Sequence, residues 1–196
     1  MTAMFATTLG VLAGVLAIAQ YGPYIGDILK GKTRPHAFSW FVWGLPTGVV
    51  FAAQLVEGGG VGAWVTGITA LMCTGIFVLA LFKGERHFLV FDWVCLALCA
   101  IALVLWTLTR DPLGAVVLST AADLIGFGPT VRKSWSRPQE ETLNTYTISG
   151  FKWSLSIAAL AVLDPTTLIY PIAMVIANWS FAVFLAHRRS RRAAVL

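Results

Sequence analysis

Residues 22–40 read GPYIGDILKGKTRPHAFSW, and residues 128–146 repeat their plan as GPTVRKSWSRPQEETLNTY. Both stretches begin with Gly-Pro, continue through a basic loop to Arg-Pro, and end in Ser-Trp or Thr-Tyr. The Gly-Pro pairs lie 106 residues apart, and Gly44 and Gly150 keep the same spacing. The Arg-Pro pairs are 103 residues apart, so the second loop is tighter by three residues before the register recovers. Such self-similarity is typical of transporters that are built from duplicated groups of helices.

The sequence around these stretches is too apolar for a water-soluble protein. Of its 196 residues, 58% are hydrophobic and 12% are charged, and the mean hydropathy is +0.79. Soluble domains average about 45–50% apolar and about 25% charged residues. Unsatisfied backbone groups are costly in lipid, so apolar blocks of about 20 residues are predicted to be transmembrane helices of an all-α membrane protein. The seven blocks are 4–29, 37–56, 62–82, 88–108, 112–131, 143–163 and 166–186.

The basic residues predict the orientation, because Lys and Arg in short loops stay on the cytoplasmic side of a membrane. Of the 14 Lys and Arg residues, 12 follow the first, third, fifth or seventh block, while Arg110 follows the fourth and Lys152 lies within the sixth. We therefore expect the N-terminus outside and the C-terminus in the cytoplasm, in the inner (plasma) membrane. The net charge of +5 is a topology signal, which makes the lipid bilayer an expected partner and nucleic acid not one.

The duplication also predicts how the chain is divided. Residues 1–84 form the first three-helix repeat, residues 85–110 contain a linker helix, and residues 111–196 form the second repeat with a basic cytoplasmic tail. One linker helix makes an odd number of crossings, so both repeats must point the same way through the membrane.

This 3+1+3 plan, with a proline late in the first helix of each repeat, resembles the PQ-loop and SWEET-like superfamily. Pro23 and Pro129 are followed by Tyr and Thr where many members carry Gln. SWEETs also carry a proline in the second helix of each repeat, where this chain has Pro46 and then Lys152. The resemblance implies a transporter for a small polar solute, such as a sugar or an amino acid, that works by alternating access.

Two ionisable residues lie near the middle of predicted helices. Asp123 and Lys152 each cost at least about 2.5–3.5 kcal/mol at bilayer depth, a cost that is usually tolerated for function or for a partner. Their helices are consecutive and antiparallel, so the two side chains could meet. Two roles stay open: a buried ion pair that fixes packing, or a working role in which Asp123 takes a proton or Lys152 meets an anionic group of the substrate.

The resemblance also implies a pocket lined by an asparagine and nearby tryptophans of the third and seventh helices. Asn178 and Trp179 lie midway along the seventh block, and pairing Phe77 with Phe181 sets Thr74 against Asn178. An Asn amide in lipid must find partners such as substrate hydroxyls or a neighbouring helix. The predicted substrate-binding residues are Asn178, Trp179, Thr74, Trp153, Lys152 and Asp123. Further polar candidates are Gln20, Gln54, Thr66 and Thr69.

Prolines inside helices are predicted hinges, because each removes a hydrogen bond from the i to i−4 ladder. The candidates are Pro23, Pro46 and Pro129. The chain has no phosphate-binding Gly-rich loop and no nucleophile near a His and an acid in the sequence, so no enzymatic activity is expected. The i, i+4 spacing of Cys95 and Cys99 could hold a metal ion in principle, but no His or carboxylate accompanies them at matching depth in the sequence. No metal site and no cofactor are therefore expected.

Alternative functions stay open. A vitamin carrier resembling the PnuC group shares the seven-helix plan, and several buried Trp residues would suit a flat aromatic substrate. A non-transporting receptor or scaffold resembling the KDEL receptor would use the cytoplasmic arginines with Glu140 and Glu141 as a docking surface. Either a monomer or a homo-oligomer is compatible with the sequence.

Reporter fusions test the predicted orientation. Green fluorescent protein fused after Leu196 should fluoresce in bacterial cells, because it folds only on the cytoplasmic side. Alkaline phosphatase fused after Glu57 should be active, because that loop is expected outside, and a fusion after Glu140 should be inactive. An active phosphatase after Glu140 would show that the charge pattern was misread.

Overall fold

The structure is a computed structural model in which residues 3–84, 90–109 and 111–193 are described. These residues form α-helices, one short 3-10 helix and no strand, which confirms the predicted all-α class. The helices are α1 (Ala3–Ala19), α2 (Tyr21–Leu29), α3 (Ala37–Val56), α4 (Gly60–Lys83), α5 (Val90–Thr109), α6 (Pro112–Ser136), α7 (Leu143–Ala159) and α8 (Pro165–Ala193), with η1 (Pro138–Glu140) between α6 and α7.

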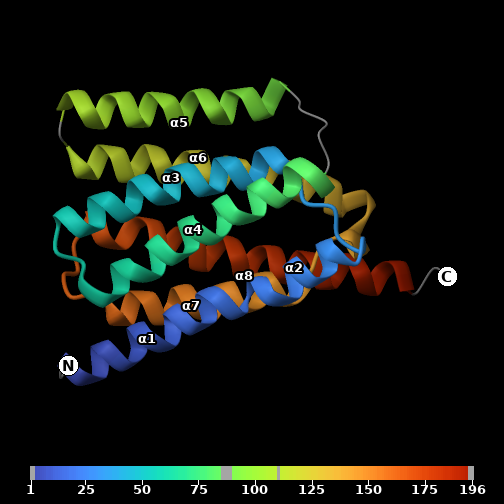
Figure 1. The fold of residues 1–196 in the computed structure, drawn as a ribbon, viewed down its shortest axis with the longest axis horizontal. Coiled ribbons are helices and arrows are strands. Elements are labelled where there is room, and N and C mark those ends of the chain that lie inside the picture. The colour runs from blue at the N-terminus through green and yellow to red at the C-terminus, as the bar shows by residue number, and fades with distance from the viewer. Residues whose placement is uncertain (1–2, 85–89, 110, 194–196) are drawn as a thin grey trace.

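The helices are those of a membrane-embedded protein. In the described part of the chain, five segments are long and apolar enough to cross a bilayer, and α5 and α7 run alongside them (Figure 1). The five segments are Met4–Leu29, Ala37–Val56, Gly60–Lys83, Pro112–Ser136 and Pro165–Arg191.

The first predicted block consists of two helices that together make one candidate span. α1 ends at Ala19 and α2 begins at Tyr21. Pro23 accounts for the break, because it has no N–H for the Ala19 carbonyl and its ring would clash with that carbonyl. By contrast, α3 and α6 continue through Pro46 and Pro129 without interruption, although the Pro129 side chain lies outside the described residues.

The sixth predicted block was too long at its C-terminal end. α7 ends at Ala159, and Leu160 is already in an extended conformation. Asp164 then caps α8, because its carboxylate accepts a hydrogen bond from the Thr167 N–H at 2.9 Å. The apolar residues 160–163 are therefore a connection, which their hydropathy alone did not reveal.

The helices pack in two groups that have the same internal order. In the first group, α1 to α4, helix α4 contacts both α1 and α3; in the second group, α6 to α8, helix α8 contacts both α6 and α7. Between the groups, α1 contacts α7, α3 contacts α6, α4 contacts α7 and α8 contacts α3. If α1 is exchanged with α6, α3 with α7 and α4 with α8, this set of contacts stays the same. α5 lies at one edge against α6 and α3 (Figure 1).

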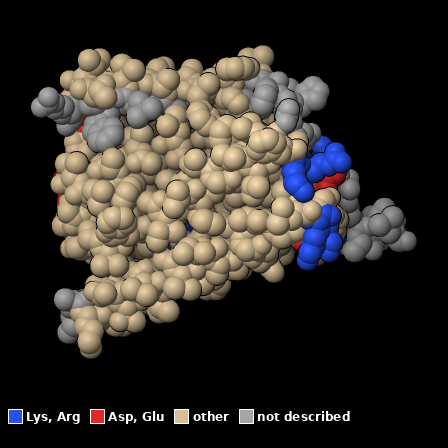
Figure 2. Space-filling view, in the orientation of Figure 1, with Lys and Arg blue, Asp and Glu red and all other residues tan. Residues whose placement is uncertain are grey.

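Charged residues differ between the two ends of the bundle. Figure 2 shows Lys and Arg side chains gathered at one end, and Figure 1 shows that α2 and α8 finish there, opposite the start of α1. We call this the basic end; it carries Lys30, Lys32, Arg34, Lys83, Arg132, Lys133, Arg137, Arg188, Arg189 and Arg191. The opposite, acidic end carries Glu57, Asp111 and Asp164. Arg86 and Arg110, which entered the orientation prediction, lie outside the described residues.

The two groups approach most closely at the acidic end. A Cβ added to Gly62 of α4 would lie 2.8 Å from the Leu160 nitrogen and 2.9 Å from the Ser156 carbonyl oxygen. The Ser156 hydroxyl donates to the Gly62 carbonyl at 3.2 Å, and the Ala161 N–H donates to the Gly59 carbonyl at 3.2 Å. Backbone therefore packs directly on backbone at this end.

Replacing Gly62 with alanine should destabilise the protein by about 1–3 kcal/mol, because the new methyl group would meet two backbone atoms that cannot rotate away. Gly75→Ala in the same helix is the matched control, since a Cβ there meets nothing within 4 Å. Thermal unfolding of both purified variants in detergent measures the difference. Equal unfolding temperatures would contradict the close approach of α4 and α7.

Candidate functional site

A cavity of about 50 Å³ lies between the two groups of helices. Its walls come from α2, α3 and α4 of the first group and from α6, α7 and α8 of the second. A space of this size holds only a few water molecules. Four of the six predicted substrate-binding residues line it: Asp123, Lys152, Trp153 and Asn178.

Asp123 is buried on α6, and its carboxylate is incompletely satisfied. Its Oδ2 accepts a long hydrogen bond of 3.4 Å from the Tyr170 hydroxyl, while its Oδ1 has no partner among the described residues. The Tyr170 hydroxyl also lies 2.7 Å from the Thr47 hydroxyl of α3. A buried polar atom without a partner costs about 1–3 kcal/mol. Asp123 therefore offers an acceptor at the cavity.

Lys152 is fully buried on α7, and its partners are neutral. Its ammonium donates to the Thr69 hydroxyl of α4 at 2.9 Å and lies 4.0 Å from the centroid of the Trp153 ring, a cation–π geometry. An ammonium has three N–H donors, so this one hydrogen bond leaves donor capacity at the cavity. Asp123 and Lys152 do meet at one cavity, but no ion pair joins these two described side chains.

Gln20 adds a second free acceptor. It lies fully buried at the break between α1 and α2, where its amide donates to the Ala17 carbonyl at 3.3 Å. Its Oε1 has no hydrogen-bond partner in the described structure. Of the further polar candidates, Gln20 and Thr69 line the cavity, whereas Gln54 and Thr66 do not.

Asn178 lines the cavity from α8, as its predicted role requires. Its amide nitrogen donates to the Met174 carbonyl one turn earlier in the same helix, at 2.8 Å. Both Asn178 and Met174 are buried and face the same space. Its amide nitrogen therefore already has a partner in this conformation.

Thr74 and Trp179, also predicted to bind substrate, do not line the cavity. Thr74 is exposed and packs on Gly44, where an added Cβ would lie 3.0 Å from its hydroxyl oxygen. Trp179 packs on Gly150 in the same manner, with its indole 2.7 Å from an added Cβ. Since Gly44 and Gly150 are equivalent in the repeat, this packing sets Thr74 against Trp179.

The packing on Gly44 and Gly150 sets Asn178 against Cys73, one residue away from the match that Phe77 and Phe181 give. Cys73 is a buried free cysteine that lines the cavity from α4. The hydrogen bonds of Thr74 and Asn178, each to the carbonyl four residues earlier in its own helix, agree instead with the match of Thr74 and Asn178. The register of the third helices stays a prediction.

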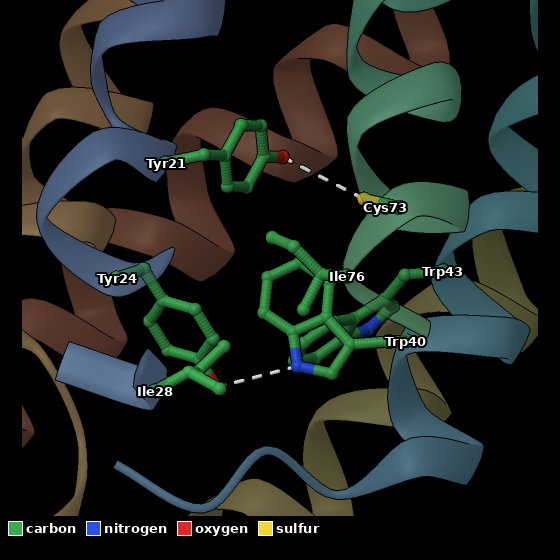
Figure 3. Close-up of a cluster of buried hydrophobic side chains, with 7 residues drawn as sticks. All are labelled: Tyr21, Tyr24, Ile28, Trp40, Trp43, Cys73 and Ile76. Carbon is green, nitrogen blue, oxygen red and sulfur yellow. Dashed lines mark hydrogen bonds between the residues drawn. The ribbon is translucent and has the colours of Figure 1, made fainter. Parts of the chain in front are cut away.

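Aromatic rings lie on the basic-end side of the cavity. Figure 3 shows Tyr24 and Ile28 facing Trp40, with Tyr21 directed toward Cys73. The Trp40 indole N–H donates to the Tyr24 hydroxyl at 3.3 Å, and the Tyr21 hydroxyl lies 3.6 Å from the Cys73 sulfur. These side chains join α2, α3 and α4 into one layer.

The ring contacts continue into the second group. Centroid distances are 5.1 Å for Trp40–Trp43 and for Trp43–Phe127, 6.0 Å for Phe127–Phe181 and 4.4 Å for Phe181–Tyr146. Trp40 and Tyr146 are the last residues of the two repeated stretches, and both line the cavity. The repeat therefore places an aromatic residue from each group beside the site.

Polar contacts join the groups beyond these rings, at the basic end. The Thr142 hydroxyl donates to the Asp27 carboxylate at 3.0 Å and lies 3.3 Å from the Thr33 hydroxyl. The Lys133 ammonium donates to the Arg34 carbonyl at 3.0 Å. The residues of this basic-end bridge are Asp27, Thr33, Arg34, Lys133, Glu141 and Thr142.

Glu141 is the most buried acid of this bridge. Its carboxylate forms an ion pair of 2.6 Å with Lys133 and accepts a hydrogen bond of 2.9 Å from the Tyr146 hydroxyl. The Arg189 guanidinium donates to the Glu141 main-chain carbonyl. With its side chain 3% exposed, Glu141 cannot belong to the docking surface that a receptor would need, whereas Glu140 is partly exposed.

Pro171 is a helix proline that the sequence reading missed. It lies inside α8 and cannot donate to the Thr167 carbonyl. The Gln54 amide of α3 donates to that carbonyl at 3.0 Å instead. Gln54 therefore joins the two groups on the acidic side, which explains why a glutamine lies in an apolar block.

Known proteins give no further guide to the site. Comparisons with models of protein families, with curated proteins and with solved structures give no match. Within residues 3–84, 90–109 and 111–193, no group of three or more His, Cys, Asp or Glu residues could hold a metal ion. Function must therefore be argued from the cavity and from the contacts around it.

Glu141→Gln should destabilise the protein by about 3 kcal/mol, because it leaves the buried Lys133 charge without its counter-ion. Glu140→Gln is the control, since Glu140 pairs with Arg137 at 3.3 Å where both side chains are partly exposed. An exposed pair of this kind contributes less than about 1 kcal/mol. Thermal unfolding in detergent should separate the two variants, and equal losses would refute the buried bridge.

Proposed function

We propose that this protein is a membrane transporter for a small polar solute, and that its two groups of helices expose a central site to each side of the membrane in turn. The observation that carries the proposal is a cavity between the groups that is lined by Asp123, Lys152 and Gln20, of which Asp123 Oδ1 and Gln20 Oε1 have no described partner. Polar and ionisable residues are expensive inside a membrane-embedded bundle and usually mark a substrate or ion pathway. A bundle that only needed to be stable would have filled this space with apolar side chains.

The proposed architecture is the 3+1+3 plan of the PQ-loop and SWEET-like superfamily. α1 and α2 would form the first span, α5 the linker, and α7 a short span of 17 residues, about 26 Å long. Contacts that stay the same when the groups are exchanged support a duplication, and α1 and α6, like α4 and α8, run in the same direction in Figure 1, as parallel repeats would. The one-sided basic residues support a cytoplasmic basic end, and chain ends at opposite ends of the bundle support an N-terminus outside.

Alternating access would require the groups to separate at one end at a time. In this conformation the aromatic layer and the basic-end bridge join them on one side, while Gly62 and Gln54 join them on the other. The cavity of about 50 Å³ is also too small for a sugar or an amino acid. The conformation therefore fits a closed stage of the cycle, and the break at Pro23 is a place where α2 could tilt away from α1.

A reversible cross-link at the basic end tests this mechanism. The double variant Thr33→Cys/Thr142→Cys should form a disulfide, because the two hydroxyl oxygens lie 3.3 Å apart. Uptake into proteoliposomes is measured with radiolabelled sugars, amino acids and aromatic vitamins. Oxidation should abolish the uptake of whichever solute the protein carries, and a reducing agent should restore it.

The two single cysteine variants are the controls, because they keep the native cysteines but cannot form the cross-link. They should transport equally well before and after oxidation. Full uptake by the cross-linked double variant would rule out opening at the basic end. Binding of a solute without flux in the uncross-linked protein would favour the receptor alternative.

Asn178→Ala tests the position of the site independently. It should lower uptake by about tenfold or more, the change expected when a hydrogen bond worth about 1.4 kcal/mol is lost from a binding site. Thr74→Ala is the matched control, because Thr74 lies in the equivalent third helix but outside the cavity. An equal effect of both substitutions would place the site elsewhere.

A further inference from the structure

Two side chains that can carry opposite charges line one cavity without pairing with each other. Asp123 of α6 is held by the Tyr170 hydroxyl, and Lys152 of α7 is held by the Thr69 hydroxyl. In a medium of low dielectric constant, two such charges attract strongly unless the structure keeps them apart. Neither side chain therefore has an ionic partner among the described residues.

Aromatic rings form the wall between the two charges. The Lys152 ammonium lies against the Trp153 ring, the Trp153 ring meets the Tyr170 ring at 5.3 Å in an edge-on arrangement, and the Tyr170 hydroxyl reaches Asp123. Both rings are almost completely buried. They fix the lysine and the aspartate at separate points on the cavity wall.

We infer that the solute bound at this site, once the two groups of helices separate and enlarge the cavity, is a small zwitterion that carries an ammonium and a carboxylate, as α-amino acids do. The carboxylate pairs with Lys152, and the ammonium pairs with Asp123. The free Oε1 of Gln20 is a second acceptor in the same cavity for the donors of the ligand. This inference rests on the proposed transport function and specifies its substrate class.

The charge balance of the site excludes the other classes of solute. An anion would leave Asp123 without a counter-charge, and a cation would leave Lys152 without one. A neutral sugar would leave both charges uncompensated. Because an uncompensated buried charge is costly, a ligand that neutralises both side chains at once is bound in preference.

Matched solutes test the inference on the unmodified protein. Alanine carries both charges, lactate only the carboxylate, alaninamide only the ammonium at pH 7, and glucose neither. Uptake into proteoliposomes and stabilisation of the purified protein against heat are measured for each, with leucine and phenylalanine as larger zwitterions. At least one amino acid should exceed lactate, alaninamide and glucose by about tenfold, the ratio that about 1.4 kcal/mol produces.

Two substitutions should change the charge preference in opposite directions. Asp123→Asn leaves a net positive site and should favour lactate over the amino acid, whereas Lys152→Met leaves a net negative site and should favour alaninamide. Misfolding would lower all uptake and would not invert a preference. Ser154→Ala is the control on α7, since its hydroxyl donates only to the Gly150 carbonyl of its own helix and does not line the cavity.

The double variant Asp123→Asn/Lys152→Met keeps the test decisive if a single variant fails to fold, because it removes both buried charges together. It should fold and lose its preference for amino acids, and a retained preference would overturn the inference. Uptake of glucose without any amino acid would also overturn it while leaving the transport function intact. Absence of flux for every solute would instead reject the transport function.

Discussion

A polar atom inside a lipid-embedded bundle has no water to bind, so it must find its partner on another helix. This constraint explains how the two groups of helices are joined. The break before Pro23 leaves the Gln20 carbonyl accessible, and the Thr145 hydroxyl of the other group donates to it at 3.3 Å. Pro171 likewise frees the Thr167 carbonyl, which Gln54 satisfies from the opposite group. Irregular backbone in one group is thus stabilised by side chains of the other.

The same constraint decided which parts of the site could be predicted. Asp123, Lys152 and Asn178 stand out in apolar blocks because each is expensive in lipid, and all three line the cavity. The helix α3 has the predicted bounds, since a loop with charges or glycine borders it on each side. Tyr170 could not be predicted, because a tyrosine in an apolar block is equally typical of packing. Such details depend on which face of each helix packs inward, which spacing along the chain does not determine.

Equal contacts do not mean equal chemistry in the two groups. Both charged residues of the cavity come from the second group, whereas the first group supplies neutral partners such as Thr47 and Thr69. Lys152 stands at the repeat position that Pro46 holds in the first group. The second group therefore supplies the aspartate and the lysine of the cavity, and the first group supplies hydroxyls that bind them or their partners.

The two ends of the bundle are joined by different kinds of contact, and this has a kinetic consequence. Side-chain hydrogen bonds at the basic end can be broken one at a time, because each joins a separate pair of side chains. At the acidic end the two groups are joined by backbone that packs on backbone at glycine residues. These contacts cannot be broken one at a time, so they must be lost together when this end opens. A carrier built in this way would face a lower activation barrier to opening on its basic side, and opening of the acidic end would limit the rate of its cycle.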